Sequence, residues 1–265
     1  MKAAGPIAPA ARLAWGAGYT LRMCQKAMLG QALGDAPERV REYIKEWAAG
    51  LASRMAIEIR VSGLDRVDWS RPAVIMANHQ SYLDVLALFT AIPRPVGVLA
   101  KKELFAVPLF GGVMRSIGCV PVDRSNRGEA MEMVRAAADQ VRAGQSIAVF
   151  PEGTRGPGDR VAPMKKGPFY LTQMAGVDIV PVGIRGSGKL MPRSNTAIYP
   201  GAIEVEVGEA LQFPPGGGPA ARRQAMNLVR DALCHLTGLP PLGERRSVPP
   251  RASAASGDSP PARGT

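Results

Sequence analysis

The sequence contains few cysteines and no long uncharged apolar run, and both shortages exclude classes of protein. Its cysteines are odd in number and far apart, at Cys24, Cys119 and Cys234, and no CxxC pair occurs. Neither a disulfide framework nor a zinc site is therefore expected, and a reducing compartment fits best. Uncharged stretches reach only about a dozen residues, whereas a membrane-spanning helix needs about twenty predominantly apolar ones. Neither a spanning helix nor a secretory signal is expected.

Acidic side chains are absent from the first 34 residues. Basic residues there, at Lys2, Arg12, Arg22 and Lys26, alternate with large apolar ones, which is typical of an interfacial amphipathic segment. The net charge of +11 also predicts an anionic partner, but charge alone does not choose among nucleic acid, a phosphorylated substrate and a membrane surface. We expect residues 1–55 to form membrane-interfacial helices at the cytoplasmic face of the cell membrane, in a monotopic or peripheral protein. A basic helix packed only on its own domain stays open as the alternative.

The rest of the chain has the organisation of one α/β domain with a tail. Residues 36–54 have helical periodicity, so a helical pair precedes the domain. Strand-like and helix-like runs then alternate over residues 56–238, which predicts a sheet covered by helices. The segment 239–265 is rich in Pro, Ser, Gly and Ala and is expected to be disordered. The expected strands are 55–61, 73–77, 96–100, 119–122, 146–150, 178–184 and 202–207, and the expected helices are 82–91, 104–116, 127–144, 167–175 and 219–236.

Two familiar catalytic motifs are incomplete or missing. The string "GIRGSGK" at residues 183–189 resembles a phosphate-binding P-loop, but Leu190 stands where the metal-binding hydroxyl is needed and Pro192 interrupts the helix that should follow. No GxSxG string occurs, so a serine hydrolase with a nucleophile elbow is not supported. Nucleotide hydrolysis and serine-dependent hydrolysis are therefore not expected.

The stretch "NHQSYLD" at residues 78–84 places one of only two histidines, His79, five positions before Asp84. Positions five apart on one helix point about 140° from each other, so the two side chains can meet only if His79 lies in a turn and Asp84 in the first turn of a helix. An imidazole oriented by a carboxylate is a general base suited to neutral pH. A capped helix start explains the same residues, and both interpretations stay open on this stretch alone.

Three further clusters lie where strands are expected to end: "KKEL" at 101–104, "GCVPVDR" at 118–124 and "FPEGTR" at 150–155. Arg155 can bind a phosphate bidentately, Lys101 adds a point charge, and the amide of Gly153 can approach an oxyanion without side-chain obstruction. Ligands of α/β sheets collect at such strand ends. Each cluster by itself is also compatible with a solvated turn.

Together, "NHQSYLD", "GCVPVDR", "FPEGTR" and the later "IVPV" resemble the four ordered blocks of the glycerolipid acyltransferase family, and most of all its 1-acyl-sn-glycerol-3-phosphate acyltransferases. The resemblance covers residues 60–210 and implies the family's mixed, largely parallel sheet. It assigns general-base catalysis to His79 and its support to Asp84. It assigns binding of the substrate's phosphate and glycerol to Lys101, Arg124, Glu152, Gly153, Thr154 and Arg155.

The resemblance implies an enzyme of phospholipid biosynthesis, a 1-acylglycerol-3-phosphate O-acyltransferase that converts lysophosphatidate into phosphatidic acid. Its acyl donor would be acyl-CoA or acyl-carrier protein, and no metal or organic cofactor is implied. One alternative is an acyltransferase of the same fold that acts on another lyso-lipid, such as a lyso-ornithine lipid. A more distant one is a basic nucleic-acid-binding module, which is disfavoured because the domain has no basic recognition helix and no aromatic-basic sheet.

Overall fold

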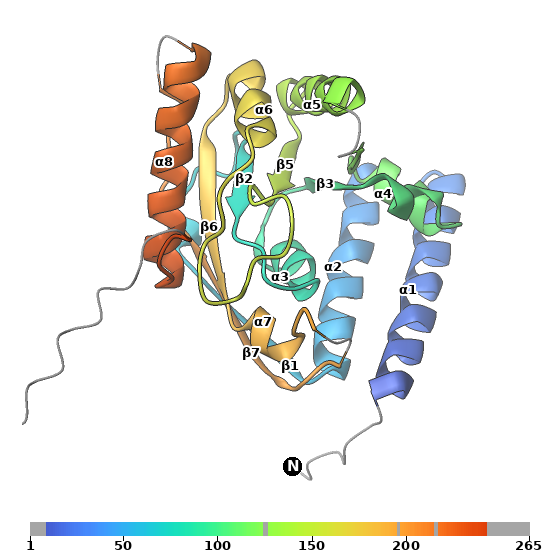
Figure 1. Ribbon diagram of the computed structural model, residues 1–265. Helices are drawn as coiled ribbons and strands as arrows, with labels where there is room; N and C mark the ends of the chain where they lie inside the picture. The colour runs from blue at the N-terminus through green and yellow to red at the C-terminus, as the bar shows by residue number, and fades with distance from the viewer. Residues whose placement is uncertain (1–8, 124–126, 195–196, 215–216, 243–265) are drawn as a thin grey trace, which may run out of the picture.

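The protein, described here by a computed structural model over residues 9–123, 127–194, 197–214 and 217–242, is a seven-stranded sheet between two layers of helices (Figure 1). The strands are β1 (Ile57–Ser62), β2 (Val74–Ala77), β3 (Val96–Lys101), β4 (Val120–Val122), β5 (Ser146–Val149), β6 (Ile179–Arg185) and β7 (Gly201–Val207). The α-helices are α1 (Pro9–Ala32), α2 (Pro37–Arg54), α3 (Leu83–Ala91), α4 (Phe110–Ser116), α5 (Arg127–Arg142), α6 (Gly167–Ala175), α7 (Ser187–Leu190) and α8 (Gly218–Thr237). Two 3-10 helices, η1 and η2, span Leu64–Arg66 and Lys102–Ala106.

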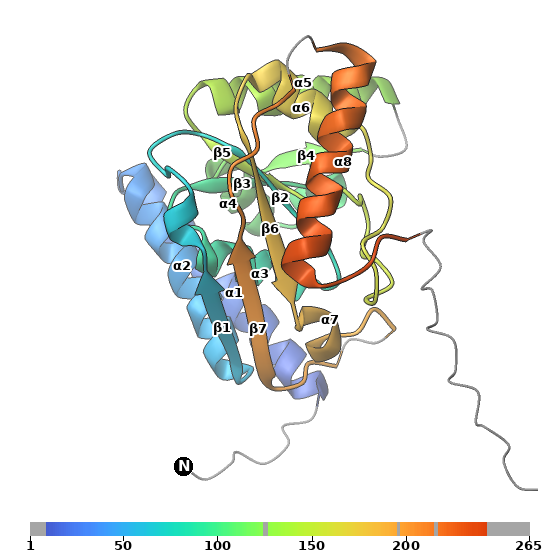
Figure 2. The same ribbon diagram turned by 90° about the vertical axis from the view of Figure 1, so that its left-hand side faces the viewer.

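The sheet is mixed and largely parallel, as the resemblance implied. Its strand order is β1-β7-β6-β2-β5-β3-β4, and the pairs from β6 to β4 are all parallel. Strand β7 runs antiparallel to β6, and β1 lies beside β7 and parallel to it (Figure 2). The carboxyl ends of β6, β2, β5, β3 and β4 therefore meet at one edge of the sheet, where ligands of α/β proteins gather.

Alternate residues of the central strands pack into two separate cores. Ile75 and Ala77 of β2 face α2, α3 and α4, whereas Val74 and Met76 face α5, α6 and α8. Strand side chains alternate between faces, so a strand covered on both sides must be apolar throughout. All four residues of β2 are fully buried. This explains why "VIMA" is an uninterrupted apolar run rather than an alternating one.

The N-terminal helical pair is present, and α2 lies between α1 and the sheet (Figure 1). One face of α1 buries Met23, Cys24 and Ala27 in a small core shared with α2 and α4. Leu21 and Leu29 of α1 remain exposed, as does Leu33 directly after it. Among the described residues, no helix is both long enough and apolar enough to cross a membrane.

The single helix expected over residues 104–116 is wrong, because the segment is divided. The 3-10 helix η2 ends at Ala106, Leu109 has a left-handed φ of 62°, and α4 begins at Phe110. Pro108 causes the break, since proline lacks an N–H donor and the residue before a proline disfavours helical dihedrals. The resulting corner places Leu104 and Val107 on the surface beside α1.

The P-loop-like string also has a different structure from a P-loop. Gly183 and Arg185 belong to β6, and the four-residue helix α7, which the sequence did not predict, follows. At the C-terminus, the backbone of residues 240–242 pairs with Val161, so the ordered part of the chain extends past the expected boundary at residue 238. The remainder of the predicted tail lies outside the described residues.

Candidate active site

His79 and Asp84 are in direct contact at the carboxyl end of β2. His79 lies in the turn between β2 and α3, and Asp84 is the second residue of α3. The His79 Nδ1 atom is 2.8 Å from Asp84 Oδ2. The His79 side chain is 14% exposed and that of Asp84 is completely buried. The five-residue spacing thus brings a buried carboxylate against a partly accessible imidazole.

Asp84 Oδ2 also organises the turn that carries His79. It accepts the main-chain N–H groups of Gln80 at 2.7 Å and of Ser81 at 2.9 Å. A carboxylate accepts hydrogen bonds, so it places the imidazole proton on Nδ1 and leaves Nε2 with its lone pair. The pair can therefore act as an oriented general base. The carboxylate does not cap α3, because Gln80 and Ser81 precede the helix; the Leu83 N–H donates instead to Ser81 Oγ at 3.3 Å.

Phe150 and Glu152, which follow β5, fix His79 from the neighbouring strand. The Phe150 ring stacks on the imidazole with centroids 4.0 Å apart. Glu152 Oε1 accepts the main-chain N–H of His79 at 2.7 Å, and Oε2 accepts that of Ala162 at 3.0 Å. In addition, the Gly156 N–H donates to the His79 carbonyl oxygen at 2.7 Å. These contacts join the "NHQSYLD" turn to the "FPEGTR" loop.

Glu152 is only 2% exposed, and burial raises its pKa to about 7, although both hydrogen bonds from main-chain N–H groups oppose that rise. Its carboxyl group is occupied by the protein backbone and does not face solvent. The assignment of Glu152 to substrate binding stays a prediction; in the structure its two oxygens accept main-chain N–H groups of His79 and Ala162 and so join two loops. This arrangement could not be read from the sequence, because it depends on β5 lying next to β2.

Gly153, Thr154 and Arg155, also assigned to phosphate binding, follow β5 at the same edge of the sheet. Arg155 is partly exposed, and its guanidinium carbon is 4.1 Å from the centre of the Tyr82 ring. Thr154 is exposed. Gly153 has a φ of 76°, but its N–H donates to the Phe150 carbonyl oxygen at 3.0 Å and is therefore engaged within the loop. We conclude that Gly153 shapes this turn and does not offer a free amide.

Lys101 and Arg124 are less closely associated with this group. Lys101 ends β3, two strands from β2 in the sheet and so about 10 Å away across it, and its ammonium is 3.1 Å from Glu103. Both side chains are exposed. Arg124 lies outside the described residues. His79, Asp84, Glu152 and Arg155 thus form one contiguous group, and Lys101 lies at its margin.

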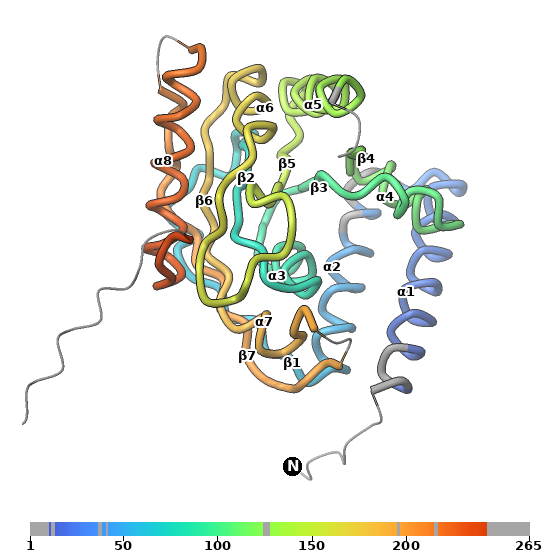
Figure 3. The backbone as a smooth tube through the Cα atoms, viewed as in Figure 1, coloured from blue at the N-terminus to red at the C-terminus, as the bar shows by residue number. Residues whose placement is uncertain are grey.

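Sequence reasoning missed three residues of this site. The amide group of Asn78 exchanges two hydrogen bonds with the backbone of Ile184 and so joins the end of β2 to β6. Tyr82 contacts Arg155, and Arg193 donates to the Arg155 carbonyl oxygen at 2.8 Å. Figure 3 shows the segment after β5 passing over this edge toward α7. No local signal identifies these partners, because they come from distant segments.

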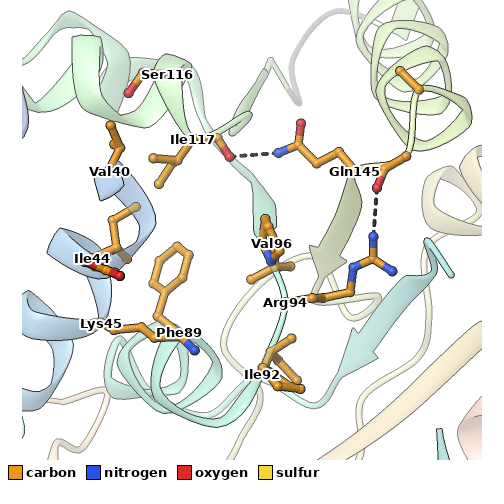
Figure 4. Close-up of a pocket in the computed structure, with 15 residues that line it drawn as sticks. Val40, Ile44, Lys45, Phe89, Ile92, Arg94, Val96, Ser116, Ile117 and Gln145 are labelled. Carbon is orange, nitrogen blue, oxygen red and sulfur yellow. Dashed lines mark hydrogen bonds between the residues drawn. The ribbon is translucent and has the colours of Figure 1, made fainter. Parts of the chain in front are cut away.

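Several cavities between the described residues lie away from the His79 group. One of about 500 Å³ opens at the amino end of β3, between α2, α3, α4 and the turn before β5 (Figure 4). Arg94 and Gln145 in its wall donate to main-chain carbonyl oxygens. A second cavity of about 140 Å³ has apolar walls from α1, α2, α3, η2, α4 and β3. Within the described residues, no three histidine, cysteine, aspartate or glutamate side chains gather as metal ligands would.

Comparison with known proteins gives consistent matches. The family model described as Acyltransferase matches residues 58–185, a range that contains every predicted site residue. A 1-acyl-sn-glycerol-3-phosphate acyltransferase of Pseudomonas aeruginosa is 30% identical over 220 residues, which are 80% of this chain and 83% of that protein. Proteins of the same name from Chlamydomonas reinhardtii and Brassica napus are 36% and 33% identical over 55% and 61% of this chain. This chain spans only 43% and 48% of those two proteins.

A solved structure shares the fold. The crystal structure of a 1-acyl-sn-glycerophosphate acyltransferase from Thermotoga maritima superposes with a TM-score of 0.67. The match covers 85% of this chain and 97% of the other, at 23% sequence identity. The arrangement of the sheet and its helices is therefore one that a known protein also adopts.

Proposed function

The chain belongs to the acyltransferase family, and from that membership we propose that it transfers a fatty acyl group from an acyl thioester to the sn-2 hydroxyl of 1-acyl-glycerol-3-phosphate. The product is phosphatidic acid, a precursor of membrane phospholipids. The observation that carries the proposal is the His79–Asp84 contact of 2.8 Å, with a stacked arginine, Arg155, on the adjoining loop. An acceptor that carries both a hydroxyl and a phosphate needs a base near the hydroxyl and a cation near the phosphate.

The chemistry follows from the orientation of His79. Its Nε2 removes the proton of the sn-2 hydroxyl as that oxygen attacks the thioester carbonyl carbon. Asp84 stabilises the imidazolium that forms. The tetrahedral intermediate then collapses, the C–S bond breaks, and the proton passes from His79 to the departing thiolate. No covalent acyl-enzyme is needed, because the acceptor hydroxyl is itself the nucleophile.

Arg155 is the residue best placed to hold the acceptor's phosphate, and Lys101 at the end of β3 adds positive charge. The resemblance assigns the same role to Arg124. Holding the phosphate converts a bimolecular encounter into an oriented one. Thr154 is exposed beside Arg155 and offers a hydroxyl to the glycerol or phosphate. Glu152 and Gly153 contribute by fixing the loop. The acyl donor is acyl-CoA or acyl-carrier protein, acting as a co-substrate, and no further cofactor takes part.

A membrane surface is the proposed location of the reaction, at its cytoplasmic face. Leu21, Leu29 and Leu33 are 49%, 61% and 78% exposed, and Arg22 is exposed beside them. Exposed leucines among basic residues suit the interface of an anionic bilayer. The apolar cavity of about 140 Å³ beneath α1 lies close to that surface and would accept part of an acyl chain.

The test is a product analysis with purified protein. Lysophosphatidate, glycerol 3-phosphate and a lyso-ornithine lipid are each supplied with acyl-CoA and with acyl-carrier protein, and products are identified by mass spectrometry. We expect phosphatidic acid from lysophosphatidate at a rate well above the other acceptors. Acylation of the lyso-ornithine lipid alone would assign the protein to that acceptor instead.

A further inference from the structure

Arg155 is held from two sides by residues that none of the four motif blocks assigns to substrate. The Tyr82 ring lies under its guanidinium at 4.1 Å, although Tyr82 itself is 61% exposed. On the other side, Arg193 from the segment after α7 donates its Nη1 N–H to the Arg155 carbonyl oxygen at 2.8 Å. Three segments of the chain therefore meet at one arginine.

The contact of the Tyr82 ring with the guanidinium uses none of the Arg155 N–H donors. A guanidinium carries its five N–H donors in the plane of the group, whereas an aromatic ring contacts the flat face. Tyr82 can therefore restrict Arg155 without using a donor that a phosphate needs. An unsupported arginine on a loop samples many rotamers, and ordering it when substrate arrives reduces affinity. Preorganisation by Tyr82 removes part of that loss.

Arg193 restricts the main chain of Arg155, as Tyr82 restricts its side chain. Its hydrogen bond connects the segment after α7 to the loop after β5, the two segments that flank the His79 turn. Ser81 of that turn also donates its hydroxyl to the carbonyl oxygen of Met191, two residues before Arg193. The α7 segment is thereby tied to both the catalytic turn and the arginine loop.

We propose that Tyr82 and Arg193 are positioning residues that hold Arg155 for the acceptor's phosphate, and that Tyr82 thereby sets the preference for phosphorylated over unphosphorylated acceptors. This inference rests on the proposed function. Tyr82 acts through the arginine, so its contribution exists only while Arg155 is present and only toward a ligand with a phosphate.

The test measures binding in the full-length protein carrying His79→Ala, in which the acceptor is not consumed. Dissociation constants are determined for 1-oleoyl-lysophosphatidate and for 1-monooleoylglycerol in the same detergent. Tyr82→Leu is expected to raise the dissociation constant for lysophosphatidate about threefold to tenfold, the range of a cation–ring contact, and to leave that for monooleoylglycerol unchanged. Tyr82→Phe, which keeps the ring, should stay within about twofold of the parent.

A double-mutant cycle separates positioning from general structural damage. In an Arg155→Ala background, Tyr82→Leu should change the lysophosphatidate dissociation constant by less than about twofold. Arg193→Ala should weaken lysophosphatidate binding more than Arg223→Ala, because Arg223 is an exposed arginine on α8 and its loss removes only charge. In protein that retains His79, Tyr82→Leu should raise KM for the acceptor and leave kcat within about twofold.

The inference is overturned if Tyr82→Leu leaves lysophosphatidate binding unchanged, weakens both ligands equally, or acts undiminished without Arg155. Equal effects of Arg193→Ala and Arg223→Ala would remove Arg193 from the proposal. If the parent protein binds lysophosphatidate no better than monooleoylglycerol, the proposed acceptor is wrong and the inference fails with it. If the parent protein prefers lysophosphatidate and Tyr82→Leu does not change that preference, this inference is wrong and the proposed function stands.

Discussion

At the scale of single residues, the site depends on carboxyl groups that bind main-chain N–H groups. Asp84 Oδ2 accepts from the backbone of Gln80 and Ser81 as well as from the imidazole, so one oxygen orients both the base and its turn. Glu152 likewise accepts main-chain N–H groups, one from His79 and one from Ala162, and so connects the turn after β2 to the loop after β5. The two carboxylates differ, because Asp84 contacts the imidazole ring of His79, whereas Glu152 contacts only the His79 main chain.

Glu152 makes stability depend on pH in a defined direction. Its pKa is raised from 4.5 to about 7, chiefly by burial. The folded protein therefore binds this proton more tightly than the unfolded chain does, and its stability falls as the pH rises from about 4.5 to about 7. Relative to a Glu152→Gln variant, the protein should lose up to about 3 kcal/mol over that range and change little above it.

Urea unfolding of both proteins between pH 4.5 and pH 8 measures this difference. The Glu152→Gln variant is the control, because its amide does not titrate and all its other titratable groups are those of the parent protein. A stability difference that stays constant across the range would show that burial does not govern Glu152, and that its two hydrogen bonds dominate instead.

At the scale of helices and strands, most elements could be predicted because their signals are local. The apolar run "AVIMA" at residues 73–77 predicted a strand, and β2 lies within it. The spacing of His79 and Asp84 placed one in a turn and the other on a helix. Strand order could not be predicted, since β7 inserts between β1 and β6 through pairings with no local signature. The contacts of Asn78, Glu152 and Tyr82 depend on that order and were missed with it.

The corner between η2 and α4 offers a test at this scale. A Cβ atom on Gly111 would overlap the carbonyl oxygen of Phe105, whereas one on Gly112 would meet only the flexible Met28 side chain at 3.2 Å. Gly111→Ala is therefore expected to destabilise the protein by about 1–3 kcal/mol, the usual range for overpacking. Gly112→Ala is the matched control in the same helix, and it should cost clearly less.

Denaturant unfolding of the two alanine variants decides the point. Equal stabilities would mean that the corner is loose and that the backbone moves without cost. In that case the segment beside Lys101 would not be fixed by η2 and α4.

At the scale of the whole molecule, the active edge and the exposed leucines of α1 belong to different layers of one fold. Helix α1 buries one face against α2 and α4 and leaves Leu21 and Leu29 in solvent. Its packed face accounts for the helix as part of the domain, and its exposed face supports contact with a membrane. The structure shows the packing of α1 on its own domain, and its contact with a membrane stays a prediction.

Membrane contact through this surface predicts a specific loss. Leu29→Glu combined with Leu33→Glu should lower binding to anionic phosphatidylglycerol vesicles at least about tenfold, because two exposed leucines that would enter the bilayer and the local positive potential are lost together. Leu228→Glu combined with Leu242→Glu is the matched control, since both leucines are exposed elsewhere, at 41% and 45%, and the charge change is the same. Vesicle sedimentation measures the binding. Equal losses in the two pairs would attribute the effect to net charge and not to α1.

The central claim, that His79 is the base of an acyl transfer to lysophosphatidate, is tested most directly by comparing the two histidines. His235 lies exposed in the last turn of α8, so His235→Ala controls for the loss of a histidine. With lysophosphatidate and the preferred acyl thioester, His79→Ala should reduce kcat for phosphatidic acid formation at least about 100-fold, and His235→Ala should leave it unchanged. A folded His79→Ala protein with near-normal kcat would contradict the mechanism.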